Sequence, residues 1–206
     1  MSANLMSLAR SGGKFLKLYG DRKMVRPLPY LRRVAYLESH GLEWIDTGVL
    51  SSSELEVAVD FVCNGGFVFG TYVQPYQFAC DTDSQGYWRI DGYGNKPSRN
   101  ISKGVRHVIV LRNGPSTLDG DVVLNINSSF FDKGSRVLLF KADTQGGLIG
   151  MVYSCSISKN GKKLRSYIPV LDLSGRPAMY DEVSGQFFYN QGMGEFTWGE
   201  LDSQTT

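Results

Sequence analysis

This chain has little of the side-chain chemistry that most often marks an enzyme centre. Its 206 residues include two histidines and three cysteines. Cys63, Cys80 and Cys155 lie too far apart for a C-x-x-C motif, and they are too few for a disulfide framework. We expect them to be small buried apolar residues in a reducing compartment. The sequence also lacks a G-x-S-x-G segment, which argues against the serine-nucleophile turn of many hydrolases.

Long apolar runs are also missing. No stretch approaches the ~20 consecutive apolar residues that a membrane-spanning helix needs. The first residues contain no apolar core of ~7–15 residues like that of a secretory signal peptide. We therefore expect no membrane span, and a protein that is made in the cytoplasm and either stays there or is assembled into a larger particle.

Charge is unevenly distributed along the chain. Residues 1–33 contain eight Lys and Arg residues against one Asp, a net charge of +7. Because the whole chain carries +2, the remaining residues carry −5. A basic arm on an acidic domain is a common arrangement for docking to an acidic partner surface. We therefore divide the chain into a docking arm and linker, 1–33, and a folded domain, 34–206; the alternative for the arm is a frayed tail with incidental charge. The predicted docking residues are Arg10, Lys14, Phe15, Lys17, Arg22 and Lys23.

From Val34 onward the pattern is that of β-structure. Residues 55–62 alternate between apolar and polar side chains, and residues 67–72 form an apolar run typical of a central strand. Asn160-Gly161 is the strongest hairpin signal. Roughly a dozen short strands, with no convincing helix after residue 33, predict a sandwich or a barrel.

One further pairing is predicted inside this β-rich region. Residues 106–111 are followed by Asn113-Gly114, a dipeptide that favours tight turns, and then by a strand-like segment near 121–126. We expect these two segments to pair as one hairpin.

The end of the chain contains the most specific pattern. Residues 164–199 read as a strand, a turn, a short strand, a second turn and a closing aromatic strand: LRSYIPVLDLSGRPAMYDEVSGQFFYNQGMGEFTWG. This order resembles the closing segment of laminin-G-like (concanavalin A-like) jelly-roll domains of gut bacteria and their phages. Residues 36–48 resemble that family's opening strand, 104–120 its central hairpin, and 137–157 the strands before the close. The resemblance covers about residues 34–199. It implies an all-β, two-sheet antiparallel jelly-roll sandwich with a short N-terminal arm.

Glucan hydrolases share this fold, so carboxylate spacing is informative. Their active strand carries a Glu-x-Asp-x-Glu trio, because alternate residues of a strand face the same way. No such trio occurs here. Retaining hydrolysis needs two carboxyl groups about 5–5.5 Å apart, and Glu54 and Glu56 share only the solvated face of their strand. His107 is expected to be a half-buried strand residue. We expect no enzyme; the alternative is a secreted or surface glycan-active enzyme of the same fold.

Aromatic rings and polar side chains gather between residues 72 and 95. Sugars are bound by aromatic faces that contact C–H groups and by polar side chains that hydrogen-bond to hydroxyls. The alternative is that half of these rings belong to the core. The predicted glycan site is Tyr72, Tyr76, Tyr87, Trp88, Tyr93 and Asn95.

A short acidic segment overlaps this region. Asp81 and Asp83, with Gly86 after them, begin like a calcium-binding loop, but the later acid and the closing Glu are absent. We expect no cofactor, and calcium held by Asp81 and Asp83 is the alternative to a simple acidic turn.

These features predict a noncatalytic binding or decoration module of a phage virion, on the capsid or the tail. The arm would bind other structural proteins of the particle, and the jelly roll would bind glycans of a cell or host surface. A homo-oligomer is compatible with this role. The folded domain is acidic and lacks clustered Arg and Lys beside aromatic rings, so nucleic acid is not expected as its partner. The alternatives are a purely structural subunit, and a location at the bacterial cell surface or in the cytoplasm.

Overall fold

The computed structural model describes residues 27–73, 76–82, 88–90, 97–99, 101–127, 134–143 and 145–201, and these are all strand, turn or loop. The six predicted docking residues of the arm lie outside the described residues. The strands are β1 (Arg32–Arg33), β2 (Tyr36–His40), β3 (Ile45–Leu50), β4 (Leu55–Val73), β5 (Tyr76–Thr82), β6 (Trp88–Ile90), β7 (Arg106–Arg112), β8 (Gly114–Leu118), β9 (Asp121–Ile126), β10 (Arg136–Leu139), β11 (Ile149–Lys159), β12 (Lys162–Leu171), β13 (Pro177–Asp181), β14 (Gln186–Phe188) and β15 (Thr197–Gly199). The expectation of an all-β fold is confirmed.

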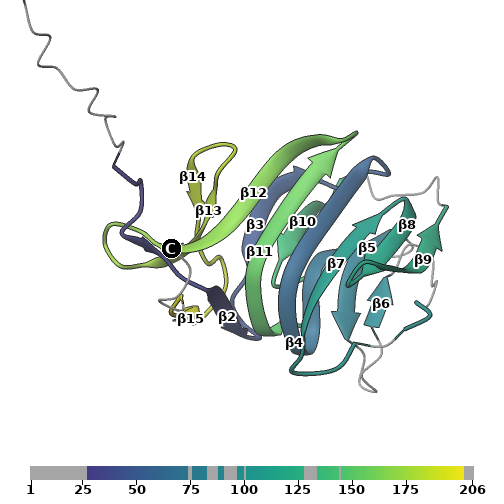
Figure 1. The fold of residues 1–206 in the computed structure, drawn as a ribbon, viewed down its shortest axis with the longest axis horizontal. Coiled ribbons are helices and arrows are strands. Elements are labelled where there is room, and N and C mark those ends of the chain that lie inside the picture. Colours follow the sequence, from purple (N-terminus) through teal and green to yellow (C-terminus); the bar gives the residue numbers. More distant parts are fainter. Residues whose placement is uncertain are drawn as a thin grey trace, which may run out of the picture.

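The strands form two antiparallel layers that share β4 (Figure 1). The large sheet has the order β14-β13-β12-β11-β4-β7-β8-β9, with β1, β2 and β15 along its flank. The small sheet has the order β3-β10-β4-β5-β6. The first half of β4 pairs with β11 and β7, and its second half pairs with β10 and β5. This arrangement is consistent with a jelly-roll-like β-sandwich.

Glycine makes the passage of β4 between the sheets sterically feasible. Gly66 has φ +80°, a region that side chains with a Cβ rarely adopt. A Cβ there would collide with the carbonyl of Gly147, which forms an isolated bridge with Phe67. The backbone of the loop before β11 therefore lies directly against β4 where β4 changes sheets.

Both sheets bury their facing side chains in one core. Because the side chains of a strand alternate between faces, every second residue of each central strand points into this core. Large side chains from both layers are almost fully buried in it, among them Ile45 and Phe69 from the small sheet, and Phe61, Ile109 and Tyr167 from the large sheet. Burial of each such side chain contributes roughly 1.5–3 kcal/mol.

The cysteines belong to this core, as expected. Cys63, Cys80 and Cys155 are buried, and none of them forms a disulfide. Burial raises the pKa of the Cys155 thiol far above its ordinary value, so it stays protonated.

Two hairpin predictions have different outcomes. Asn160-Gly161 joins β11 to β12, with φ +51° and +74° as a tight turn requires. The predicted pairing of residues 106–111 with 121–126 is wrong, because β8 lies between them and pairs with both β7 and β9. β8 begins Gly114-Pro115-Ser116, residues that are typical of a turn.

Candidate ligand-binding groove

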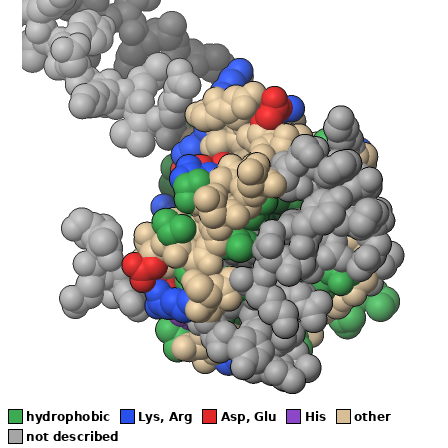
Figure 2. Space-filling model, turned by 90° about the vertical axis from the view of Figure 1, so that its right-hand side faces the viewer, with side chains coloured by type: hydrophobic (Ala, Val, Ile, Leu, Met, Phe, Trp, Pro, Cys, Tyr) green, Lys and Arg blue, Asp and Glu red, His purple; other side chains and the backbone are tan. Residues whose placement is uncertain are grey.

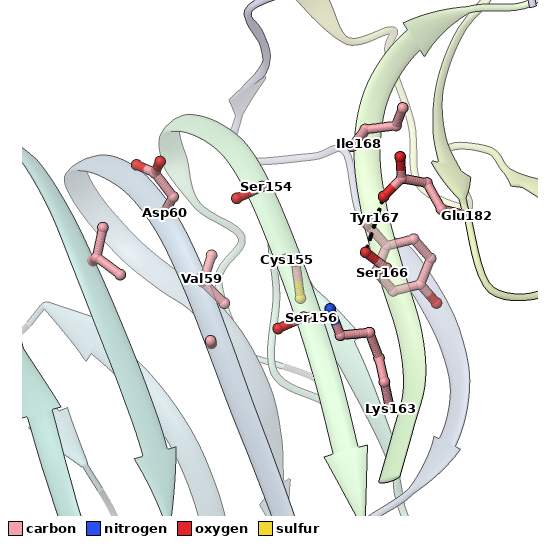
Figure 3. Close-up of a pocket in the computed structure, with 12 residues that line it drawn as sticks. Val59, Asp60, Ser154, Cys155, Ser156, Lys163, Ser166, Tyr167, Ile168 and Glu182 are labelled. Carbon is pink, nitrogen blue, oxygen red and sulfur yellow. Dashed lines mark hydrogen bonds between the residues drawn. The ribbon is translucent and has the colours of Figure 1, made fainter. Parts of the chain in front are cut away.

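The outer face of the large sheet carries a groove at its centre. Directly paired residues of neighbouring strands point to the same side of a sheet. Asp60 pairs with Ser154, and Ser156 pairs with Ala58 on one side and Ser166 on the other. These small side chains leave a hollow of about 360 Å³ between larger neighbours, which we call the outer-face groove. Figure 3 shows that Asp60 lies at one side of the groove and Glu182 at the other, with β11 and β12 between them.

An irregularity in β11 adds an aromatic ring to this face. Val152 lies opposite Phe61 and Ser154 lies opposite Asp60, so Tyr153 is an extra residue in the ladder. Such a β-bulge redirects a side chain that regular alternation would send to the opposite face. Tyr153 accordingly lines a second hollow, of about 540 Å³, together with Arg106 and Tyr36. Asp60 and Ser154 line both hollows, so the two hollows form one continuous surface.

An ion pair fixes the polar groups next to Tyr153. Arg106 donates from Nε to Asp60 Oδ1 and from Nη2 to Asp60 Oδ2, both at 2.7 Å. Its guanidinium carbon lies 3.8 Å from the centre of the Tyr153 ring, and Tyr36 packs edge-on against that ring at 5.3 Å. The hydrogen bonds to Asp60 raise the pKa of Arg106, and burial raises the pKa of the Tyr153 hydroxyl. At neutral pH this end of the groove therefore presents a neutral phenol ring stacked on a fixed cation.

The opposite end of the groove rests on a rigid turn. Asp181 is fully buried and accepts hydrogen bonds from the backbone N–H of Ser166, Val183 and Ser184. This turn places Glu182 so that its carboxylate accepts a hydrogen bond of 3.1 Å from the Ser166 hydroxyl. Lys163 also lines this end.

Aromatic side chains continue the face beyond the groove. Ile168 lines the groove and also belongs to a small apolar cluster with Val170 and Ala178. Rings packed on this cluster form a contiguous row in which the nearest centroids lie 5.2–6.0 Å apart: Tyr30, Tyr180, Phe187 and Tyr189. The outer face thus combines hydroxyls, one bidentate ion pair and aromatic rings.

The predicted glycan cluster lies almost entirely outside the described side chains. Tyr72 is half-buried and packs edge-on against Phe67 at 5.2 Å. The backbones of Tyr76 and Trp88 lie in β5 and β6, where Trp88 pairs with Thr82. The remaining predicted residues, Tyr87, Tyr93 and Asn95, lie outside the described residues. The cluster therefore stays a prediction.

The calcium alternative also remains untested. The backbone of Asp81 pairs with Arg89 between β5 and β6, while the side chain of Asp81 and the whole of Asp83 are outside the described part. Within the described residues, no group of three or more His, Cys, Asp or Glu side chains could hold a metal ion.

His107 is a buried strand residue, more enclosed than the half-burial expected from the sequence. Its Nδ1 lies 2.8 Å from Asp119 Oδ2. Burial tends to raise the pKa of Asp119, but hydrogen bonds from the Val108 N–H and from His107 outweigh it and lower that pKa overall. The pair joins β7 to the turn after β8.

Sequence reasoning missed the groove and its Tyr153–Arg106–Asp60 end. One signal was available, since Ser154, Ser156 and Ser158 alternate with apolar residues in a strand that is otherwise rich in large side chains. The bulge that turns Tyr153 outward has no comparable signature in the sequence. Arg106 and Asp60 are 46 positions apart and meet only through the pairing of β4 with β7.

Comparison with protein families and with curated sequences adds no relative. No protein-family model matches this chain, and no curated protein matches its sequence. In the described part of the chain, no helix is long and apolar enough to cross a membrane. On the face shown in Figure 2, described Lys and Arg side chains lie beside Asp and Glu rather than in a separate basic area.

Proposed function

We propose that this protein is a noncatalytic glycan-binding module of the laminin-G-like jelly-roll type, displayed on a phage particle. The outer-face groove is the observation that carries the binding role. Its serine hydroxyls and its Arg106–Asp60 pair provide donors and acceptors for sugar hydroxyls, and Tyr153 provides a ring for C–H contacts. The combined hollows are of the size that takes a small ligand or part of a chain.

The carboxylates of the groove support binding over hydrolysis. Asp60 is on β4 and Glu182 follows β13, so β11 and β12 separate them. The Glu182 carboxylate is held by the Ser166 hydroxyl of β12. Asp60 is also held by Arg106. The glycan-active enzyme therefore remains the second candidate.

A glycan array of the full-length chain tests the binding role. We expect wild type to bind a subset of glycans and Tyr153→Ala to weaken that binding about fivefold or more, since an aromatic contact contributes roughly 1 kcal/mol. Tyr153→Phe keeps the ring and should bind like wild type. Circular dichroism checks that each variant is folded.

Trp88→Ala provides the matched comparison. Loss of binding in Trp88→Ala with binding retained in Tyr153→Ala would move the site to the predicted cluster at β5 and β6. Absence of binding to every glycan would contradict the glycan-binding function and favour a purely structural subunit.

The location on a particle rests on the charge distribution and the family resemblance. The basic residues precede a domain whose Tyr30 packs against Tyr180 and whose Leu31 N–H donates to Leu171 O at 2.9 Å. A variant that begins at residue 27 therefore removes most of the basic charge without removing these contacts. When the chain is expressed together with the structural proteins of a phage particle, we expect the full chain to co-sediment with particles and the shortened chain to stay in solution. Co-sedimentation of both, or of neither, contradicts docking through the arm.

A further inference from the structure

A pocket of about 420 Å³ lies at one end of the sandwich, separate from the outer-face groove. Three connections form it: the loop from β2 to β3, the loop from β10 to β11 and the segment between β14 and β15. It shares no lining residue with the two hollows of the outer face. We call it the end pocket.

Two buried or half-buried polar side chains make the end pocket rigid. The Glu43 carboxylate is 4% exposed and accepts hydrogen bonds from His40 N at 2.8 Å and Ser39 Oγ at 3.1 Å. Asn190 Oδ1 accepts from Trp44 N at 3.1 Å and from Gly192 N at 2.8 Å. The Glu43 bonds close the first loop on itself, and the bond from Trp44 N to Asn190 joins the first loop to the third.

Glycine allows the loops to approach closely enough to enclose the pocket. A Cβ at Gly192 would collide with the carbonyl of Leu42, and a Cβ at Gly147 would lie 2.5 Å from the carbonyl oxygen of Gly41. The pocket is therefore preformed, which lowers the entropic cost of binding a ligand.

The groups that face the end pocket have a specific combination of chemistry. Trp44 is half-buried, and Lys141 Nζ lies 5.5 Å from the centre of its ring. The amide side chains of Gln145 and Gln191 also line the pocket. The described lining contains no carboxylate, and the hydrogen bonds of the Glu43 carboxylate go to the loop itself. The end pocket thus offers a ring, amides and one positive charge.

We propose that the end pocket is a second binding site, which takes a single pyranose unit bearing a carboxylate. The Trp44 ring would contact the apolar face of the sugar, Lys141 would pair with its carboxylate, and the glutamine amides would hydrogen-bond to its hydroxyls. A volume of about 420 Å³ suits one sugar ring rather than a longer chain. This site does not depend on ligand binding by the outer-face groove.

The test is a pair of titrations of the full-length, ¹⁵N-labelled chain, followed by NMR. The ligands are methyl glucuronide and methyl glucoside, which differ at the carboxylate, each added to about 50 mM so that millimolar dissociation constants are measurable. We expect the glucuronide to shift the Trp44 indole N–H and the amides of Gly147 and Gly192. We also expect it to bind about tenfold more tightly than the glucoside, because only the glucuronide has a carboxylate that can form a charge-assisted hydrogen bond with Lys141.

Lys141→Gln should abolish the preference for the glucuronide, while Lys103→Gln, which changes an exposed lysine outside both the end pocket and the outer-face groove, should leave that preference intact. Equal affinity for the two sugars, or no shift with either, overturns the proposal. Shifts confined to Tyr153, Ser154 and Ser156 also overturn it, because they would assign the acidic sugar to the outer-face groove. If glycan binding is lost in Tyr153→Ala and no end-pocket signal shifts with either sugar, the proposed function is supported and the second binding site is refuted.

Discussion

The carboxylate of Asp172 holds the turn between β12 and β13. Its Oδ1 accepts hydrogen bonds from Ser174 N at 2.8 Å, Ser174 Oγ at 2.6 Å and Arg176 N at 3.0 Å, and its Oδ2 accepts one from the Tyr189 hydroxyl at 2.9 Å. The hydrogen bond from the Ser174 hydroxyl is the largest of the effects that lower the pKa of Asp172 from 3.8 to about 2. One ionised side chain thereby connects the turn to the aromatic row of the outer face.

This lowered pKa gives stability a definite pH dependence. A carboxylate whose pKa is lower in the folded state stabilises that state fully above its unfolded pKa, and the contribution is lost as pH falls through the folded pKa. Asp172→Asn should therefore lower the free energy of unfolding at pH 7, and the difference from wild type should shrink between pH 4 and pH 2. Urea unfolding at a series of pH values measures this difference in the free energy of unfolding. Glu195→Gln, which changes an exposed carboxylate, is the control. A difference that is the same at pH 7 and pH 2 contradicts this role for the carboxylate.

At the scale of the element, β4 depends on a glycine where it changes sheets. Gly66→Ala should destabilise the fold by about 2–4 kcal/mol, since the new Cβ is strained at φ +80° and meets the Gly147 carbonyl. Gly120→Ala is the matched control, because Gly120 has φ +89° with open space around it. Gly120→Ala should lower the free energy of unfolding by only about 1 kcal/mol, because only the backbone conformation is strained. Thermal unfolding of the two variants compares them, and equal losses would show that contact with Gly147 is unimportant.

Elements with a local signal were predictable, and elements defined by their neighbours were not. The alternation of residues 55–62 correctly predicted the first part of β4, and the turn at Asn160-Gly161 correctly predicted the β11–β12 hairpin. The sequence suggested two strands in 55–72, but the structure has one strand of 19 residues, because Gly66 lets the chain bend without breaking its pairing. β8 was missed because Pro115 and Ser116 read as a turn, and only pairing with β7 and β9 makes them extended.

At the scale of the whole molecule, the short segment before β2 belongs to the packed structure. Tyr30 packs against Tyr180, and β1 pairs with the end of β12. We expect a chain that begins at residue 27 to unfold at the same temperature as the full chain. A chain that begins at residue 34 should unfold about 3–6 °C lower, as expected for a loss of about 1–2 kcal/mol. Scanning calorimetry measures the melting temperatures of both shortened chains. Equal values would contradict a stabilising role for residues 27–33.

The layered architecture could be anticipated from the sequence, while the binding surface could not. Strand number, turns and the closing segment are local patterns, and they predicted an all-β fold. The groove depends on which strands are neighbours, since Asp60, Ser154 and Ser166 come together only through the pairing of β4, β11 and β12. The end pocket likewise brings three loops that are distant in sequence together around Trp44, a residue that no local pattern singles out.

The sharing of β4 between both layers has a consequence for how the molecule opens. A sandwich made of two separate sheets can lose one layer while the other stays paired. Here the same strand is internal to both sheets, so separating the layers means breaking β4 away from β11 and β7 or from β10 and β5. Amide protons along β4 should therefore exchange with solvent only when the entire domain unfolds, whereas those of β9 and β14, at the outer margins, exchange through local fluctuations.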